Sequence, residues 1–155
     1  MSKLKRNFKP YIITLVVIAC LIGIYVMVFM RPQPLMDCVD GTEAPNAGQI
    51  VMYEQDKNAV TLTFHSQEEL ADLWNAMQNT HVRFLRGRGI VSVPQGGAYY
   101  ELSLQALDAS GNEDGAYAFG CASDGGLVIA GSDYEIVGES DLAAELEALF
   151  ADTAE

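Results

Sequence analysis

Residues 98–107 read AYYELSLQAL, and this stretch carries the clearest strand signal in the chain. Apolar and polar side chains alternate along it, which is typical of a half-buried strand with one face against a core. We therefore expect a sheet with one covered face and one open face. The covered face would hold Tyr100, Leu102, Leu104 and Ala106, and the open face would hold Tyr99, Glu101, Ser103 and Gln105.

Shorter stretches on both sides repeat this alternation, and turns rich in Asp, Asn and Gly separate them. At residues 124–126 the sequence DGG predicts a tight hairpin. Connections this short are typical of antiparallel neighbours. Further strands are expected at Gln49–Gln55, Ala59–His65, the first half of His81–Arg88, Ala116–Cys121, Leu127–Ala130 and Tyr134–Val137, with an edge strand or a loop at Ile90–Gly97.

Two segments have the apolar period of amphipathic helices. The first begins at Ser66, which forms a capping box with Glu69, and it ends near Asn79. The second covers Ser140–Phe150 and starts with a capping serine. We interpret Trp74 as a core residue rather than a ligand platform, because it lies on the apolar stripe. The stripes consist of Leu70, Leu73, Trp74 and Met77 in the first helix, and of Leu142, Leu146, Leu149 and Phe150 in the second.

These elements predict an α+β fold for residues 48–151. We expect one antiparallel sheet with two amphipathic helices on one of its faces. The chain after the first thirty residues is long enough for one domain with a substantial core, and too short for two. No period of 20–50 residues recurs, so a repeat array is not expected.

Ahead of this domain, Tyr11–Met30 reads YIITLVVIACLIGIYVMVFM, twenty residues without a charge. As a helix it would span about 30 Å, the thickness of a bilayer's hydrocarbon core. We expect a single-pass transmembrane helix, retained in the lipid bilayer of the cell membrane. A cleaved signal peptide is an alternative, but the apolar run is long and no small-residue cleavage site follows it. A lipoprotein is another, since residues 17–20 resemble a lipobox ending at Cys20, but ten more apolar residues follow.

The distribution of charge sets the expected orientation. Four basic residues and no acidic one precede the helix, whereas all 21 acidic residues follow it. The positive-inside rule then places residues 1–10 in the cytoplasm and the C-terminal domain outside the cell. Residues 31–47 hold three of the five prolines and are expected to form a stalk. The chain after the helix has 21 acidic and five basic residues, so it should repel nucleic acid.

Two sets of residues in the domain have a possible role in binding or cross-linking. Arg83, Arg86 and Arg88 would form a patch that binds an anionic polymer, a lipid head group or an acidic partner. The favoured alternative is that these arginines neutralise the domain's own carboxylates. Cys38 and Cys121 would be able to form a disulfide in an oxidising compartment, although Cys121 has the pattern of a core residue.

No arrangement of side chains predicts a catalytic site, a metal site or a cofactor. His65 and His81 lack the clustered partners that a zinc site needs. The stretch DASGNEDG (108–115) is rich in potential calcium ligands. An EF-hand loop counted from its first residue would need Gly and Glu where Glu113 and Phe119 stand. We therefore interpret this stretch as a hairpin loop.

The order of the parts resembles small membrane-anchored extracytoplasmic proteins of Gram-positive bacteria that are grouped as domains of unknown function. The resemblance rests on VTLTF (60–64), HSQEEL (65–70) and YEIVGESDLAAELEAL (134–149). It implies a short basic start, one anchor, a stalk and one sheet-and-helix module. It implies no activity.

The sequence favours a membrane-anchored, extracytoplasmic binding or interaction module that is not an enzyme. Its partner would be an envelope protein or polymer, met at the arginine patch or at the open face with Tyr99, Glu101 and Ser103. An accessory or regulatory subunit of an envelope membrane complex, held through Gly23 and Cys20, is an alternative. A wall-directed hydrolase would need two positioned carboxylates, and the common hydrolase motifs are absent from the sequence.

Overall fold

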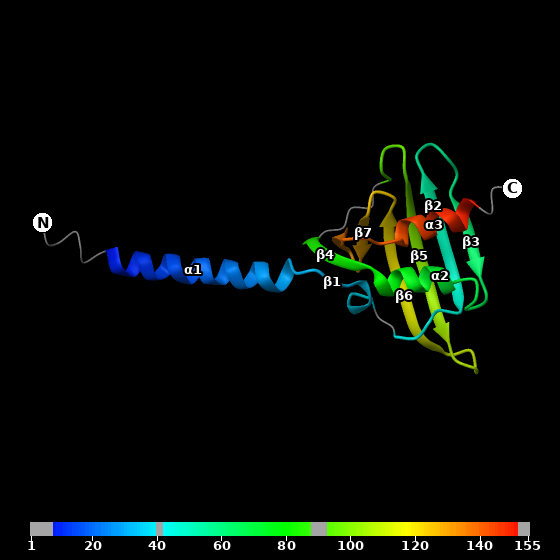
Figure 1. Cartoon of the computed structure of the whole chain (residues 1–155), viewed down its shortest axis with the longest axis horizontal. Coiled ribbons are helices and arrows are strands. Elements are labelled where there is room, and N and C mark those ends of the chain that lie inside the picture. The colour runs from blue at the N-terminus through cyan, green and yellow to red at the C-terminus, as the bar shows by residue number, and fades with distance from the viewer. Residues whose placement is uncertain (1–7, 40–41, 88–92, 152–155) are drawn as a thin grey trace, which may run out of the picture. The chain divides into compact units, whose positions relative to one another are not determined.

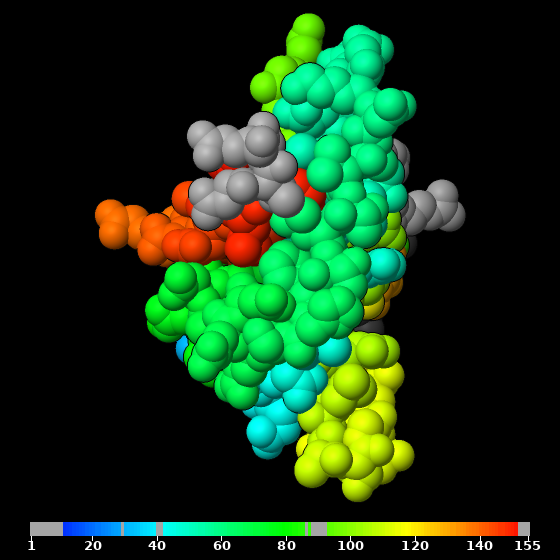
Figure 2. Space-filling model, turned by 90° about the vertical axis from the view of Figure 1, so that its right-hand side faces the viewer, coloured from blue at the N-terminus to red at the C-terminus, as the bar shows by residue number. Residues whose placement is uncertain are grey.

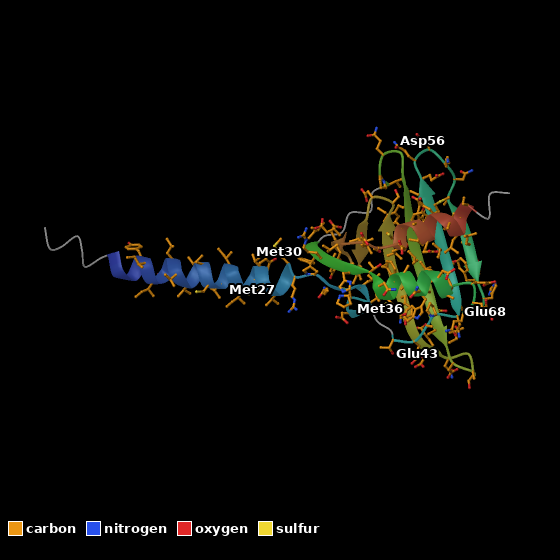
Figure 3. The ribbon with its side chains drawn as sticks, in the orientation of Figure 1. Met27, Met30, Met36, Glu43, Asp56 and Glu68 are labelled. Carbon is orange, nitrogen blue, oxygen red and sulfur yellow. The ribbon has the colours of Figure 1, made fainter. Side chains whose placement is uncertain are left out.

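The computed structural model describes residues 8–39, 42–87 and 93–151, and its two compact units divide between residues 31 and 32. The first unit is the helix α1 (Phe8–Phe29). Within it, Tyr11–Val28 has a mean hydropathy of 2.7, and none of this segment is buried. Its side chains are almost entirely carbon in Figure 3, whereas oxygen atoms are numerous on the second unit. The prediction of a helix long and apolar enough to cross a membrane is confirmed.

The second unit has the predicted α+β fold, with a single antiparallel sheet (Figure 1). The eight described strands follow one another across the sheet in the order β1-β4-β8-β7-β6-β5-β2-β3. Two α-helices and one short 3-10 helix complete the part of the unit that the structure describes. The elements are β1 (Gln33–Pro34), η1 (Leu35–Asp37), β2 (Ala47–Glu54), β3 (Val60–Phe64), α2 (Ala71–Asn79), β4 (His81–Arg86), β5 (Ala98–Leu107), β6 (Glu113–Ala122), β7 (Gly126–Ile129), β8 (Ser132–Val137) and α3 (Leu142–Ala151).

The strand β5 lies inside the sheet, and its side chains alternate as predicted. Leu102 and Leu104 are each 1% exposed, whereas Ser103 between them is exposed. Leu102 is in register with Ile50 of β2 and with Phe119 of β6, and all three belong to one core. Full burial of one such side chain stabilises the fold by about 1.5–3 kcal/mol, so this covered face holds the sheet together.

The helices α2 and α3 cover the core face of the sheet, and both lie in front of the strands in Figure 1. Trp74 of α2 packs its ring against Tyr117 of β6, with centroids 5.4 Å apart. Phe150 of α3 packs against Tyr100 of β5, with centroids 5.6 Å apart. The interpretation of Trp74 as a residue that packs on the core is therefore confirmed.

Side-chain hydrogen bonds lie in the turns before α2 and at its C-terminal end. Glu69 accepts a bond from the backbone N–H of His65 at 2.9 Å, and Ser66 accepts one from the N–H of Glu69 at 3.4 Å. The bond from the Glu69 N–H to Ser66 is the part of the predicted capping box that forms, but Ser66 does not cap the α-helix. Tighter turns occupy residues 66–70, and α2 begins at Ala71 without a side-chain cap. At the other end, the buried Thr80 hydroxyl lies 2.6 Å from the hydroxyl of Ser140, just before α3.

The structure differs from the expected stalk over residues 31–47. Gln33–Pro34 forms β1 and pairs with β4, and the next residue, Leu35, is fully buried in the core. Val39 is buried as well. Proline interrupts regular structure, but it does not keep the apolar residues between prolines out of a core. The chain therefore enters the folded unit at its first strand, and three residues separate this strand from the end of α1.

Candidate binding surface

The sheet face opposite α2 and α3, which we call the outer face, is not covered by either helix. In Figure 2 both helices lie on one side of the strands, and the other side of the sheet belongs to this face. The strand register aligns Thr63 of β3, Gln49 of β2 and Ser103 of β5 in one row across it. All three side chains are exposed. Polar residues at alternate strand positions thus meet side by side on the outer face.

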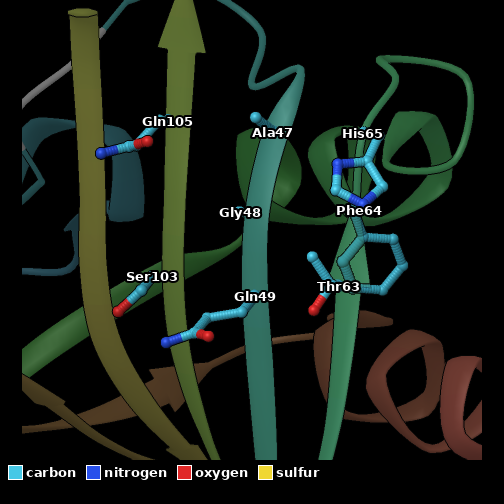
Figure 4. A pocket seen from close by; sticks show the side chains of 8 residues that line it. All are labelled: Ala47, Gly48, Gln49, Thr63, Phe64, His65, Ser103 and Gln105. Carbon is cyan, nitrogen blue, oxygen red and sulfur yellow. The ribbon is translucent and has the colours of Figure 1, made fainter.

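A shallow groove of about 330 Å³ crosses β2, β3 and β5 on this face (Figure 4). Its polar side chains are two amides, two hydroxyls and one imidazole, and no carboxylate lines it. One of the amides, Gln105, donates a hydrogen bond to Glu113 at 3.1 Å. Amides and hydroxyls both donate and accept hydrogen bonds, so the groove suits a neutral polar ligand or a main chain. The lining residues are Ala47, Gly48, Gln49, Thr63, Phe64, His65, Ser103 and Gln105.

Tyr99 differs from the expected open face, because it is only 5% exposed. Its ring occupies the space above Gly120 of β6, where a Cβ atom would come within 1.6 Å of the phenol oxygen. Tyr99 is in register with Ala122, so Gly120 is a diagonal neighbour within reach of an aromatic side chain. Tyr53 lies beside it, with ring centroids 6.4 Å apart, and donates a hydrogen bond to Glu101 at 3.1 Å. Small residues on β6 therefore let Tyr99 lie across the sheet.

The predicted arginine patch is reduced by an ion pair. Arg83 of β4 pairs with Glu135 of β8, and its Nε atom donates to the carboxylate at 2.7 Å. Both side chains are partly exposed, so such a pair contributes at most about 1 kcal/mol. Arg83 thus pairs with one of the domain's own carboxylates, as the alternative of charge neutralisation expects, and its part in a binding patch stays a prediction. The side chain of Arg86 and the whole of Arg88 lie outside the described residues.

The disulfide between Cys38 and Cys121 is not formed, and both thiols are free. Cys121 is fully buried in the core, and this burial, with a smaller effect of Asp124, raises the pKa of its thiol to about 12. Cys38 is half-buried and accepts a hydrogen bond from Gln33 at 3.1 Å. Burial raises the pKa of this thiol too. A reactive cysteine needs a lowered pKa, so neither thiol is activated as a nucleophile.

The loop that begins at Asp108 forms its hydrogen bonds within itself. The Asp108 carboxylate accepts bonds from the backbone N–H groups of Asn112 and Ser110, at 2.9 and 2.8 Å. These bonds lower the pKa of the carboxyl group, with the Asn112 backbone as the largest cause. The loop joins β5 and β6 as the predicted hairpin connection. Within the described ranges, no group of three or more His, Cys, Asp or Glu side chains is placed to hold a metal ion.

The groove residues were predicted only in part. The sequence drew attention to Ser103 on the open face of β5. The groove adds Gln49 of β2, Thr63 of β3 and His65, which directly follows β3. Alternation within each strand places these polar residues on one side. Their meeting depends on the placement of β2 between β3 and β5, which no single strand pattern reveals.

Comparison of the chain with models of protein families, with curated proteins and with solved structures found no match. The resemblance to anchored extracytoplasmic proteins of Gram-positive bacteria therefore stays a prediction. Function is inferred from the geometry of the outer face.

Proposed function

We propose that this chain is a membrane-anchored binding module that holds its folded unit outside the cell and binds an envelope component through the outer face. The observation that supports this proposal most strongly is that the groove is polar but lined by no carboxylate, although the unit has 21 acidic residues. Charges would select oppositely charged ligands at long range, whereas amides and hydroxyls select by hydrogen-bond geometry. An envelope protein or a neutral segment of a wall polymer has the groups that such a surface recognises.

The proposed orientation follows from the charges around α1. The basic residues Lys3, Lys5, Arg6 and Lys9 precede the apolar segment, and Arg31 is the one basic residue close after it. Cytoplasmic flanks carry the excess of Lys and Arg, so the folded unit belongs outside. Protease added to intact cells should remove an epitope placed after Glu155. Digestion only after lysis would contradict this orientation.

A non-enzymatic role is supported by two carboxyl groups whose pKa is lowered and not raised. Hydrogen bonds from backbone N–H groups lower the pKa of both Glu69 and Asp108, with the His65 N–H the largest cause for Glu69. A general acid at neutral pH needs the opposite shift. The groove itself is lined by no carboxylate. We therefore propose binding without chemistry.

The binding proposal is tested with the full chain in lipid nanodiscs and solubilised envelope fractions. The variant Gln49→Lys/Ser103→Lys puts two long charged side chains on the outer face and should reduce capture of the envelope component at least tenfold. The matched control Gln78→Lys/Ala148→Lys adds the same charge at exposed positions of α2 and α3 and should bind like the unmodified chain. Equal capture by all three proteins would contradict the proposal.

Replacing α1 with an unrelated membrane helix distinguishes a binding module from a subunit of a membrane complex. A binding module should capture the same envelope component after the exchange, because the outer face is untouched. Loss of capture would favour the alternative in which the helix itself, around Gly23, makes the contact. Apart from the backbone of α1 and the two chain neighbours of Gly23, no described atom lies within 4 Å of the position where a Cβ on Gly23 would stand.

A further inference from the structure

The two edges of the sheet differ in how well they are protected from pairing with another strand. Among the described strands, β1 and β3 are the edges. The strand β1 has two residues, and one of them is Pro34, which has no N–H to offer. The strand β3 has five residues, Val60–Phe64, without proline, glycine or charge. Soluble proteins normally shorten, charge or bend such an edge, and β3 shows none of these devices.

The ladder of β3 with β2 is regular, so its free side is regular as well. Five consecutive residue pairs run from Gly48–Phe64 to Met52–Val60 without a register shift. In an antiparallel ladder, alternate residues of an edge strand direct both N–H and C=O away from the neighbour. These main-chain groups are complementary to another extended chain. Figure 2 faces this side of the unit, and the blue-green surface of the β2–β3 region lies along it.

The side chains of β3 indicate the pattern that a ninth strand would carry. On the helix side, Val60 is 42% exposed and Leu62 is half-buried, so apolar area is left for a partner to cover. On the outer face, Thr61 and Thr63 are exposed, and Thr63 lines the groove. A partner strand would therefore place apolar residues beside Val60 and polar residues beside the threonines.

Acidic residues near both ends of β3 favour a partner strand with basic residues at its ends. Glu54 and Asp56 precede β3 at the hairpin tip, and Glu68 and Glu69 follow it. In Figure 3, Asp56 and Glu68 lie toward opposite ends of the strand. Lys57 forms an ion pair with Glu54 at 2.5 Å, which leaves an excess of acid at both ends. A second copy of this chain would bring acid against acid, whereas basic residues would be attracted.

We propose that β3 accepts an extended segment of a partner protein as a ninth strand, and that this segment alternates apolar and polar residues and is basic at its ends. This inference rests on the proposed binding function and names the class of partner. Main-chain hydrogen bonds would supply affinity, and the alternating side chains and terminal charges would supply specificity.

The test uses the full chain in nanodiscs and the capped peptide Lys-Val-Thr-Val-Thr-Val-Lys as probe. The peptide should bind and should slow hydrogen exchange of amides in Val60–Phe64 at least tenfold. The same peptide with N-methyl groups on alternate residues keeps its charge and loses main-chain donors, so it should bind at least tenfold more weakly. Equal binding of both peptides, or protection confined to β5, would overturn the inference.

Two variants with the same added charge test whether the edge is the site. Thr61→Lys/Thr63→Lys protects the edge and should weaken peptide binding at least tenfold, whereas Gln78→Lys/Ala148→Lys, at exposed positions of α2 and α3, should change it less than twofold. The conservative Thr61→Ser/Thr63→Ser should bind normally. The reverse order, or a dimer of this chain formed through β3, would overturn the inference. If the peptide binds but the chain captures no envelope component, the proposed function is refuted. If the chain captures an envelope component through the outer face but does not bind the peptide, only the inference about β3 is refuted.

Discussion

At the scale of single residues, Gly120 and Tyr99 depend on each other. Because Gly120 has no side chain, the ring of Tyr99 can lie over it, and a Cβ atom at this position would clash with the ring. An aromatic ring that covers a glycine on a neighbouring strand restores apolar contact that the glycine lacks. The Tyr99 side chain of β5 therefore covers part of the outer face over β6.

We predict that Gly120→Ala destabilises the folded unit by about 1–3 kcal/mol, because the new methyl group displaces the Tyr99 ring. Urea unfolding with and without Tyr99→Ala measures this effect. In the Tyr99→Ala background the same substitution should cost much less, since the clash is gone. Gly87→Ala is the control, because a Cβ atom there meets nothing within 4 Å. Equal costs in both backgrounds would show that the ring does not matter.

The thiol of Cys121 should be unreactive in the folded chain. Its pKa of about 12 leaves almost no thiolate at pH 8, and the side chain is fully buried. In a Cys20→Ala background, maleimide should label Cys38 slowly and Cys121 only after unfolding. The raised pKa also means that the folded state keeps a proton that the unfolded state releases above pH 9, so stability should fall as the pH rises from 9 toward 12. Prompt labelling of Cys121, or a Cys38–Cys121 disulfide in a non-reducing digest, would contradict this prediction.

At the scale of elements, the segment after α1 belongs to the fold. The strand β1 closes one edge of the sheet, and η1 inserts Leu35 into the core. The backbone N–H of Leu35 also donates to the carbonyl of Thr80 at 2.9 Å, so the segment is tied to the end of α2. A soluble fragment must therefore begin before Gln33.

We expect Leu35→Ala to lower the free energy of unfolding by about 2–5 kcal/mol, the cost of deleting a large buried aliphatic side chain. The exposed neighbour Asp37 provides the control, and Asp37→Ala should change stability by less than about 0.5 kcal/mol. Denaturant curves of the 32–155 fragment give both values. A fragment of residues 45–155 should be less stable than either variant. Equal stability of the two fragments would show that β1 and η1 are dispensable.

At the scale of the whole molecule, charge is strongly unbalanced. The folded unit contains all 21 acidic residues against four basic ones, and its ion pairs include Glu54–Lys57 and Arg83–Glu135. Repulsion among like charges disfavours a compact state, and salt screens it. Such a charge also keeps copies of the unit apart, which protects a bare edge such as β3 from self-pairing.

The melting temperature of the folded unit should therefore rise by a few degrees between 0.01 and 0.5 M NaCl, about the range over which screening becomes strong. Calorimetry of the 32–155 fragment at pH 7 measures it, and KCl should act like NaCl. Arg83→Gln should leave this dependence almost unchanged, because one exposed pair contributes little. A melting temperature that falls with salt would show that ion pairs outweigh the repulsion.

The elements themselves were readable from the chain. The apolar run of α1, the alternation in β5 and the stripes of α2 and α3 are local patterns, and a period of two or 3.6 residues appears directly in sequence. Together they predicted the α+β class and the face that the helices cover. Boundaries were less accurate where capping signals compete with tighter turns, as before α2.

The arrangement that makes the outer face required the folded unit. The order of β3, β2 and β5 brings the groove residues together, and the contact of Tyr99 with Gly120 joins positions 21 residues apart. Burial of Leu35 in a proline-rich segment also depends on distant partners, namely the core residues it meets. Such long-range contacts are selected by the fit of the whole sheet, so no single stretch of the chain contains the information that places them.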